Sequence, residues 1–407
     1  MRRFRAAALA VVCVGLRAHL GAAEELTLNQ AMALARERTP SIVAARLAID
    51  EAHGRLASAS VLLRDNPVVD GAAGPRIKGG GEQSLEARLG FSQGFELGGK
   101  RGARIDAAEA DVARAGALAD NALRAVLRDV AIAFYQALHA TQSLELAQRA
   151  DAMAVDIVRI AERRFAAGDF ARLDVSLAQA ARSRADAAVL DAEAGRDEAV
   201  GVLRVLLAIG AAEPLTVRGA LTADSAQSLE TLHEQARQRP DLRALEAEIR
   251  EAEAEAQLGR AEGWPDVSVG AEYERDENDN LALGRLSVTL PVFSRGEGRR
   301  AESMARASRL RTELEAGQRA TVTELSIAYD IYRRRVAAAD ELTRHAVPLQ
   351  DTNETLARRA YETGEIGLVD LLAVRREVLD TRQDSLDRSL ESAIAAVDLE
   401  FRAGVLK

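Results

Sequence analysis

The sequence contains a single cysteine, Cys13, so the rest of the chain has no disulfide framework. Its five histidines are isolated, and no His, Cys and carboxylate residues have the spacing of a metal site. Acidic residues outnumber basic ones, and the resulting net charge of −9 argues against nucleic-acid binding. After the first residues, no apolar run is long enough for a transmembrane helix. Nothing in the sequence therefore points to an enzyme, a cofactor or a resident metal.

The N-terminus has the pattern of a secretory signal. Three arginines within the first residues precede an apolar run over 6–16, and Gly21-Ala22-Ala23 offers a cleavage site. We therefore expect residues 1–23 to be a signal peptide. Cys13 lies inside it and lacks the usual sequence context for lipidation. An exported chain without a transmembrane helix is expected in the periplasm, outside the cell, or in the outer membrane as a β-barrel.

Most of the chain is rich in Ala, Leu, Arg and Glu, a composition that favours helix. Apolar residues such as Leu127, Val130 and Phe134 recur at spacings of three and four, which predicts one buried helix face. Two segments, about 102–167 and about 298–363, predict helices ~100 Å long, far beyond an ordinary globular helix. Shorter helices, which can stack end to end to match the long ones, are expected over residues 28–64, 173–206, 229–262 and 368–406.

Two further segments, about 66–95 and about 265–293, each contain two runs of alternating apolar and polar residues separated by a turn. In the second segment, Val267, Val269 and Tyr273 share one face. The pattern predicts two β-hairpins, each with an apolar and a polar face. Most of the runs have a length that crosses an outer membrane when the strand is tilted. Two hairpins in a soluble domain would show the same alternation.

The chain repeats its signals about 200 residues apart, which indicates a duplicated structural unit. The segment 164–168, Arg-Phe-Ala-Ala-Gly, recurs at 360–364 as Ala-Tyr-Glu-Thr-Gly, and an aspartate follows each segment at the same distance. We therefore expect two structural repeats, over residues 24–215 and 216–407. Each would contain helices, one hairpin and one long helix.

Four strands cannot close a barrel by themselves, and an unpaired sheet edge is not tolerated in lipid. If the hairpins lie in a membrane, the barrel must therefore be shared between chains. Three chains would supply about twelve strands, which is a workable barrel size. The sequence thus favours a homotrimer.

The chain resembles the TolC family of outer-membrane efflux proteins over essentially the whole of residues 24–407. The resemblance is carried by the duplicated helix–hairpin–helix order, by the repeated aromatic-x-x-Gly signature, and by Leu203-Arg204-Val205-Leu206-Leu207. Within the family, the strand-to-helix junctions 93–101 and 290–298 are most similar to the CzcC-type heavy-metal efflux branch. Gly94 departs from this pattern, because proline is expected there.

The resemblance implies an α+β membrane protein in the outer membrane of a Gram-negative cell. Each chain would contribute four strands to a shared twelve-stranded trimeric β-barrel, and a long α-helical barrel would form a tunnel across the periplasm. The assembly would be the passive exit duct of a tripartite efflux system. Its implied partners are outer-membrane lipid, a periplasmic adaptor and an inner-membrane transporter of the resistance-nodulation-division (RND) type, with heavy-metal cations as cargo.

Two alternatives remain open at this point. In the first, the duct serves drug efflux or type I secretion instead of metal efflux, because the sequence does not name the cargo. A protein of a different class, a periplasmic coiled-coil adaptor or structural protein without a barrel, would also be rich in helix. Strands of membrane-crossing length favour the duct.

The resemblance places adaptor contacts at the helical turns and gating contacts close behind them. Gating or constriction is implied for Asp174, Tyr361 and Asp370, where a ring of aspartates would attract cations. Aspartate is also favoured in the first turn of a helix, which is the structural alternative. Ala373 stands where the family has a second aspartate. The residues implied for adaptor docking are Gly168, Asp169, Phe170, Gly364, Glu365 and Ile366.

Overall fold

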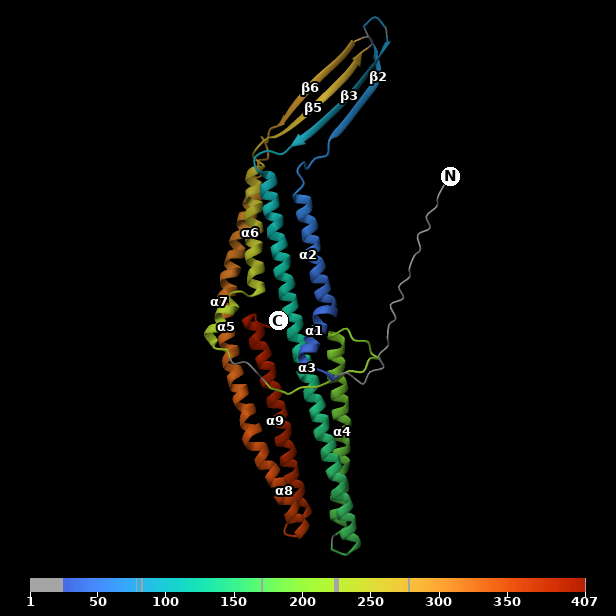
Figure 1. The fold of residues 1–407 in the computed structure, drawn as a ribbon, viewed down its shortest axis with the longest axis vertical. Coiled ribbons are helices and arrows are strands. Elements are labelled where there is room, and N and C mark those ends of the chain that lie inside the picture. Colours follow the sequence, from blue (N-terminus) through green and yellow to red (C-terminus); the bar gives the residue numbers. More distant parts are fainter. Residues whose placement is uncertain are drawn as a thin grey trace, which may run out of the picture.

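The computed structural model describes residues 25–77, 79–81, 83–169, 171–222, 227–276 and 279–406. A four-stranded sheet lies at one end of a long stack of helices, and two helical turns lie at the other end (Figure 1). The expected signal peptide and Phe170 fall outside the described residues.

The main sheet is antiparallel and has the strand order β2-β3-β5-β6. Each hairpin pairs internally, and β3 pairs with β5 so that Leu89 lies opposite Tyr273 and Phe91 opposite Ala271. The last strand stops at Thr289, short of the expected end at 293, where Pro291 lacks the N–H needed for a ladder hydrogen bond. The strands are β2 (Val68–Ile77), β3 (Gln83–Phe95), β5 (Asp266–Asp276) and β6 (Asp279–Thr289), and a small parallel pair is formed by β1 (Glu25–Leu26) and β4 (Thr216–Val217).

One long helix, α3 (Lys100–Ala166), runs without interruption from the sheet to the far turn (Figure 1). Its counterpart is divided into α7 (Glu297–Glu341), a π-helical turn η1 (Leu342–Ala346) and α8 (Val347–Thr363). The expected single helix over 298–363 is therefore interrupted. Pro348 explains the position, because its ring displaces the carbonyl four residues earlier and it donates no hydrogen bond.

Proline also divides two segments that the sequence predicts as single helices. The segment 28–64 forms α1 (Leu28–Arg38) and α2 (Pro40–Ala59), and 229–262 forms α5 (Leu229–Ala236) and α6 (Pro240–Ala261). Proline is well accommodated at the first position of a helix, where the missing N–H has no intrahelical partner. The remaining helices are α4 (Arg172–Leu206) and α9 (Leu368–Ala403).

The core lies between the helices near the middle of the stack. There α1 packs on α3, where Leu127, Val130 and Phe134 are fully buried, as their spacing predicts. A separate cluster fixes α5 on α7 and α9, with Leu232 and Leu325 at its centre. Among the described residues, no helix combines the length and the apolar character needed to cross a bilayer.

Candidate functional site

The residues predicted for docking and gating gather at the end of the molecule that is opposite the sheet (Figure 1). They belong to two turns, one between α3 and α4 and one between α8 and α9. The structure brings both turns to the same end, so the described residues of the two predicted groups lie on or just beneath one terminal surface.

The turn between α3 and α4 depends on Gly168, whose φ of +88° favours glycine. The N–H of Gly168 donates to the carbonyl of Phe165 (3.0 Å), and the N–H of Asp169 donates to the carbonyl of Arg164 (2.9 Å). This pair of hydrogen bonds is the Schellman arrangement that closes a helix. It leaves Gly168 and Asp169 exposed at the tip.

The turn between α8 and α9 has the same construction. Gly364 has a φ of +82°, its N–H donates to the carbonyl of Tyr361 (3.2 Å), and the N–H of Glu365 donates to the carbonyl of Ala360 (2.8 Å). Gly364 and Glu365 are exposed, whereas Ile366 is half-buried against the apolar cluster beneath the turn. Ile366 therefore contributes to the packing of the tip.

Asp174 and Asp370 both cap the helix that leaves their turn. The Oδ2 atom of Asp174 accepts the N–H of Ala171 (3.1 Å), and Oδ2 of Asp370 accepts the N–H of Gly367 (3.2 Å). Neither Ala171 nor Gly367 has a side-chain acceptor, so only the returning half of a capping box is present. The structural role that we weighed against gating is thus present at both aspartates.

Tyr361 lies beneath the turns and is only 2% exposed. Its ring packs in a cluster that receives side chains from α3, α4, α8 and α9, and so joins the two helical hairpins. The guanidinium carbon of Arg164 lies 5.1 Å from the ring centroid. Burial raises the pKa of Tyr361, as does Asp174, while Arg164 and Arg375 act in the opposite direction. The buried members of the cluster are Ile157, Val158, Ala161, Ala178, Ala357, Tyr361, Leu368 and Leu371.

Sequence reasoning missed two groups of residues at this end. Arg375 of α9 reaches across to α3, where its Nη1 donates to the carbonyl of Met153 (3.4 Å), and burial lowers its pKa. Two apolar side chains, Leu173 and Val369, are exposed close to the turns, beside the exposed Phe165 of the repeated aromatic-x-x-Gly signature. No periodic signal marks Leu173 and Val369, although an apolar residue next to a predicted glycine turn is a usable hint.

The elements form one open layer at each level of the molecule. In the sheet, β2 and β6 are the edge strands. Nearest the sheet, the helices are ordered α2, α3, α6, α7, and nearest the turns they are ordered α4, α3, α9 and the rod formed by α7 and α8. Among the described residues, β2, α2 and α4 therefore form one edge, and β6, α7 and α8 form the other.

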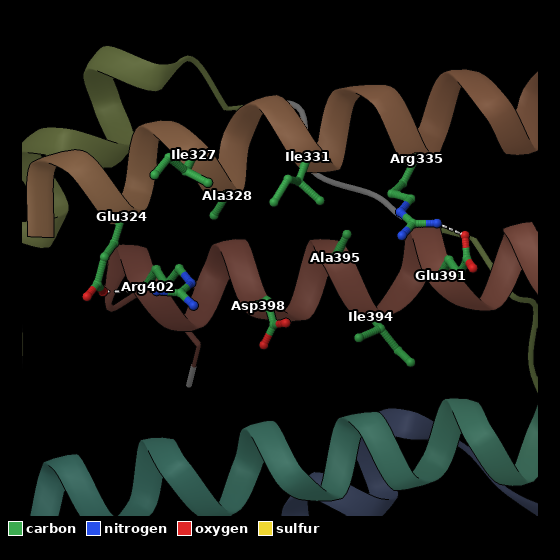
Figure 2. Close-up of a pocket in the computed structure, with 10 residues that line it drawn as sticks. All are labelled: Glu324, Ile327, Ala328, Ile331, Arg335, Glu391, Ile394, Ala395, Asp398 and Arg402. Carbon is green, nitrogen blue, oxygen red and sulfur yellow. Dashed lines mark hydrogen bonds and ion pairs between the residues drawn. The ribbon is translucent and has the colours of Figure 1, made fainter.

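Both edges of the helical part expose apolar side chains. On α4 these are Leu190, Val202 and Val205. On α7, Ile327 and Ile331 line an open groove of about 530 Å³ between α7 and α9 (Figure 2). Ion pairs frame this groove, because Arg402 binds Glu324 (2.9 Å) at one end and Arg335 binds Glu391 at the other.

The sheet has one apolar and one polar face. Arg88 on the polar face is the centre of an ion network, with its Nε 2.9 Å from Glu272 and its Nη2 3.4 Å from Glu274. Arg285 binds Glu272 from the next strand, and Glu272 is only 7% exposed. The apolar face of the three strands β3, β5 and β6 presents Leu89, Phe91, Val267, Val269, Tyr273, Leu286 and Val288.

Comparison with known proteins identifies this architecture. The family model described as outer membrane efflux protein matches residues 31–208 and 231–405. The chain belongs to the outer membrane efflux protein family. The predicted resemblance is thereby confirmed, as are the outer-membrane location and the role of efflux duct. The family consists of transport proteins, in agreement with a chain that shows no enzyme motif.

Relatives of this outer membrane efflux protein include metal-resistance proteins. It is 26% identical to the cobalt-zinc-cadmium resistance protein CzcC of Cupriavidus metallidurans over 89% of this chain and 86% of that protein. It is 28% identical to the nickel and cobalt resistance protein CnrC of the same organism, over 74% and 73%. The fold matches the Campylobacter jejuni CmeC outer membrane channel with a TM-score of 0.76 at 16% identity, covering 93% of this chain and 85% of that chain.

Proposed function

We propose that three copies of this outer membrane efflux protein close into one duct that carries heavy-metal cations out of the cell. The observation that carries the proposal is the pair of open edges. From the sheet to the turns, one edge is formed by β2, α2 and α4, and the other by β6, α7 and α8. Joining β6 to β2, α7 to α2, and the α7–α8 rod to α4 of the next copy would extend each layer without a break. A closed ring leaves no unpaired strand edge in lipid, and three copies give about twelve strands.

Side-chain chemistry supports such a ring. Exposed apolar residues on α4 (Leu190, Val202, Val205) would meet the exposed Ile327 and Ile331 of α7, and burying both sets would stabilise the assembly. The apolar face of the sheet suits lipid, and the polar face with its ion network suits an aqueous lumen.

The internal repeat has a role in this proposal. Residues 24–215 and 216–407 would each supply one hairpin to the barrel and one set of helices to the tunnel. Three chains would then present six similar hairpin turns at the periplasmic end.

These turns are the proposed docking surface for a periplasmic adaptor. Asp169 and Glu365 are exposed at the tips, and the exposed Phe165, Leu173 and Val369 add apolar surface around them. Exposed apolar side chains next to exposed polar ones are typical of a protein interface. The adaptor would connect the duct to an inner-membrane transporter of the RND type.

Metal cations are the proposed cargo because the names of CzcC and CnrC report resistance to cobalt, zinc, cadmium and nickel. At the periplasmic entrance, Asp174 and Asp370 lie near the tips, and copies of them in a ring would attract cations. Tyr361 and Arg164 hold the two hairpins together and would limit how far the entrance opens.

The test is to purify the protein in detergent, measure its molar mass, and record conductance in a planar bilayer. The proposal predicts a complex of three chains that forms cation-conducting channels, with a smaller cation preference in Asp370→Ala. Unaltered conductance and selectivity in that variant would remove the constriction role. A soluble single chain without conductance would overturn the duct and favour a coiled-coil periplasmic protein.

A further inference from the structure

A pocket of about 740 Å³ lies at mid-height of the molecule, between α1, α5 and the C-terminal end of α9 (Figure 1). Residues of α3 and α6 also line it, and all of the lining belongs to one chain. Its volume is in the usual range of ligand sites. The membrane contact and the adaptor contact proposed above lie at the two ends of the molecule, so neither of them explains this pocket.

Positive charge is concentrated at the pocket, although the chain as a whole is acidic. Three arginines from three helices line it, Arg36 of α1, Arg124 of α3 and Arg243 of α6. Among the described lining residues, the only carboxylate is Asp120, which lies 3.6 Å from Arg243. Pro240 brings the N-terminus of the 22-residue helix α6 to the pocket, and the positive end of a helix favours an anion.

Arg124 is a buried charge without a carboxylate of its own. It is only 3% exposed, its Nη1 donates to the carbonyl of Phe401 (2.7 Å), and its Nη2 donates to Oδ1 of Asn121 (2.7 Å). A carboxylate oxygen of Asp241 lies 3.6 Å away, but Arg239 already binds both oxygens of that group (3.1 and 2.6 Å). Burial lowers the pKa of Arg124, because desolvation disfavours the charged form. An anion in the pocket would add the counter-charge that this site lacks.

Two side chains at the pocket have hydrogen-bonding groups to spare. Within the part of the chain that the structure describes, no hydrogen bond or ion pair holds the guanidinium of Arg36, which is half-buried. The Oε1 atom of Gln235 is buried and finds no donor among the described residues. Guanidinium groups bind carboxylates through two parallel hydrogen bonds, and glutamine amides pair with the N–H and C=O groups of a peptide. Two further glutamines line the pocket, Gln227 and Gln238.

In the proposed duct, the pocket would open on the outer wall. The helix α1 packs on α3, and α5 packs on α7 and α9. Both lie on the same face of the helical layer, because Arg36 and Gln235 line one pocket together with Asp120 of α3. The bore of a duct has to stay open, so the face that carries these additional helices would be the outer one. A ligand would then reach the pocket from the periplasm.

We infer that this pocket binds a short peptide that ends in a free carboxylate, and that the peptides of the cell wall supply it. Arg36 and Arg124 would hold the carboxylate, and the glutamines would pair with the peptide groups behind it. A pocket of this size suits the end of a peptide, whereas a folded partner needs a surface of about 800 Å². The cell wall lies in the periplasm, so a duct that crosses this space would be tethered to it at mid-height. The site goes beyond the proposed function, because it lies within one chain and does not require the ring.

The first measurement tests the chemistry of the ligand. The full protein in detergent is titrated by calorimetry with acetyl-Lys-D-Ala-D-Ala, as the free acid and as the C-terminal amide. The acid should bind, and the amide should bind at least about tenfold more weakly, because it loses a charge-assisted hydrogen bond to arginine. Arg36→Gln should weaken binding of the acid about tenfold as well. The matched control is Arg38→Gln, at an exposed position of the same helix outside the pocket, and it should bind like the parent.

Three results of this titration would overturn the inference. Equal binding of the acid and the amide would mean that no carboxylate is recognised. Equal losses in Arg36→Gln and Arg38→Gln would mean that the pocket is not the site. Acetate that binds as tightly as the peptide acid would mean that the pocket takes any small anion and does not recognise a peptide.

The second measurement tests the source of the ligand. Purified cell-wall sacculi are sedimented with the protein, which should sediment with them and be released by the peptide acid. Arg36→Gln should sediment less than Arg38→Gln, while both should conduct like the parent in planar bilayers. Peptide binding without sedimentation would overturn the cell wall as the partner. A loss of conductance in Arg36→Gln alone would place Arg36 in the duct itself and overturn its role on the outer wall.

Discussion

The guanidinium of Arg164 lies over the ring of Tyr361, with 5.1 Å between the guanidinium carbon and the ring centroid. The same guanidinium donates to the backbone carbonyls of Tyr361 (3.3 Å) and Glu362 (3.1 Å). One side chain of α3 therefore binds both the ring and the backbone of α8. This contact joins the two helical hairpins just behind their exposed turns.

Replacing Arg164 with alanine should loosen the periplasmic end. A cation–π contact contributes about 0.5–1 kcal/mol and a hydrogen bond from a charged donor about 1.5 kcal/mol or more. We therefore expect Arg164→Ala to weaken the interaction between the two hairpins by roughly 2 kcal/mol. The variant should then show a larger mean conductance in planar bilayers. Arg163→Ala changes the exposed neighbour in the same turn, and equal conductance gains in both variants would contradict this role for Arg164.

The two functions proposed for Asp370 can be separated by two substitutions. Asp370→Asn keeps an oxygen that can accept the N–H of Gly367 but removes the charge, whereas Asp370→Ala removes both. The asparagine variant should lose cation selectivity at nearly unchanged stability. The alanine variant should lose cation selectivity and, in addition, about 1 kcal/mol of stability. Reversal potentials and thermal unfolding measure the two effects. Wild-type selectivity in Asp370→Asn would leave capping as the only role.

The periodic parts of the fold can be predicted from the sequence. Alternation predicts the strands, because a sheet with two different faces imposes a period of two. Spacings of three and four predict the buried stripe that includes Leu127 and Phe134. The interruptions of the helices are harder to predict. Pro40 and Pro240 are compatible with a helix that starts at the proline, and the π-turn before Pro348 leaves no periodic mark in the sequence.

The candidate site could be predicted only in its local features. Gly168 and Gly364 end helices for a reason visible in the sequence, and the aspartates that follow them suit a first helical turn. The contact of Arg164 with Tyr361 and the reach of Arg375 to Met153 join distant segments. Such contacts depend on how the helices pack, which one sequence does not reveal.

Two adjacent glycines before α3 allow the packing of Trp264, the only tryptophan of the chain, to be tested. Gly98 and Gly99 both have positive φ, +73° and +81°, but only at Gly98 would a Cβ atom meet Trp264. Gly99→Ala should cost roughly 1–2 kcal/mol from backbone strain alone. Gly98→Ala should cost a further 1–3 kcal/mol or so from overlap, and should shift Trp264 emission. Equal losses of stability in the two variants, with unchanged emission, would contradict a tightly packed indole.

Glu400 of α9 should make the stability of the protein depend on pH. Burial raises the pKa of its carboxyl group, so the folded protein holds this proton more tightly than the unfolded chain does. The stabilising effect of the proton is therefore complete below the unfolded pKa of about 4.3, and it is lost as the pH rises through the folded pKa. At neutral pH the buried charge destabilises the protein.

Glu400→Gln removes that charge with little change in shape. The variant should unfold at a higher temperature than the parent at pH 7. Its free energy of unfolding should rise by at most about 1 kcal/mol, because the side chain is only part-buried and solvent screens it. The gain should shrink to nothing as the pH falls toward about 4. Glu234→Gln, at an exposed position of α5, should show no comparable gain. A gain for Glu400→Gln that persists unchanged at low pH would mean that packing, and not a buried charge, explains it.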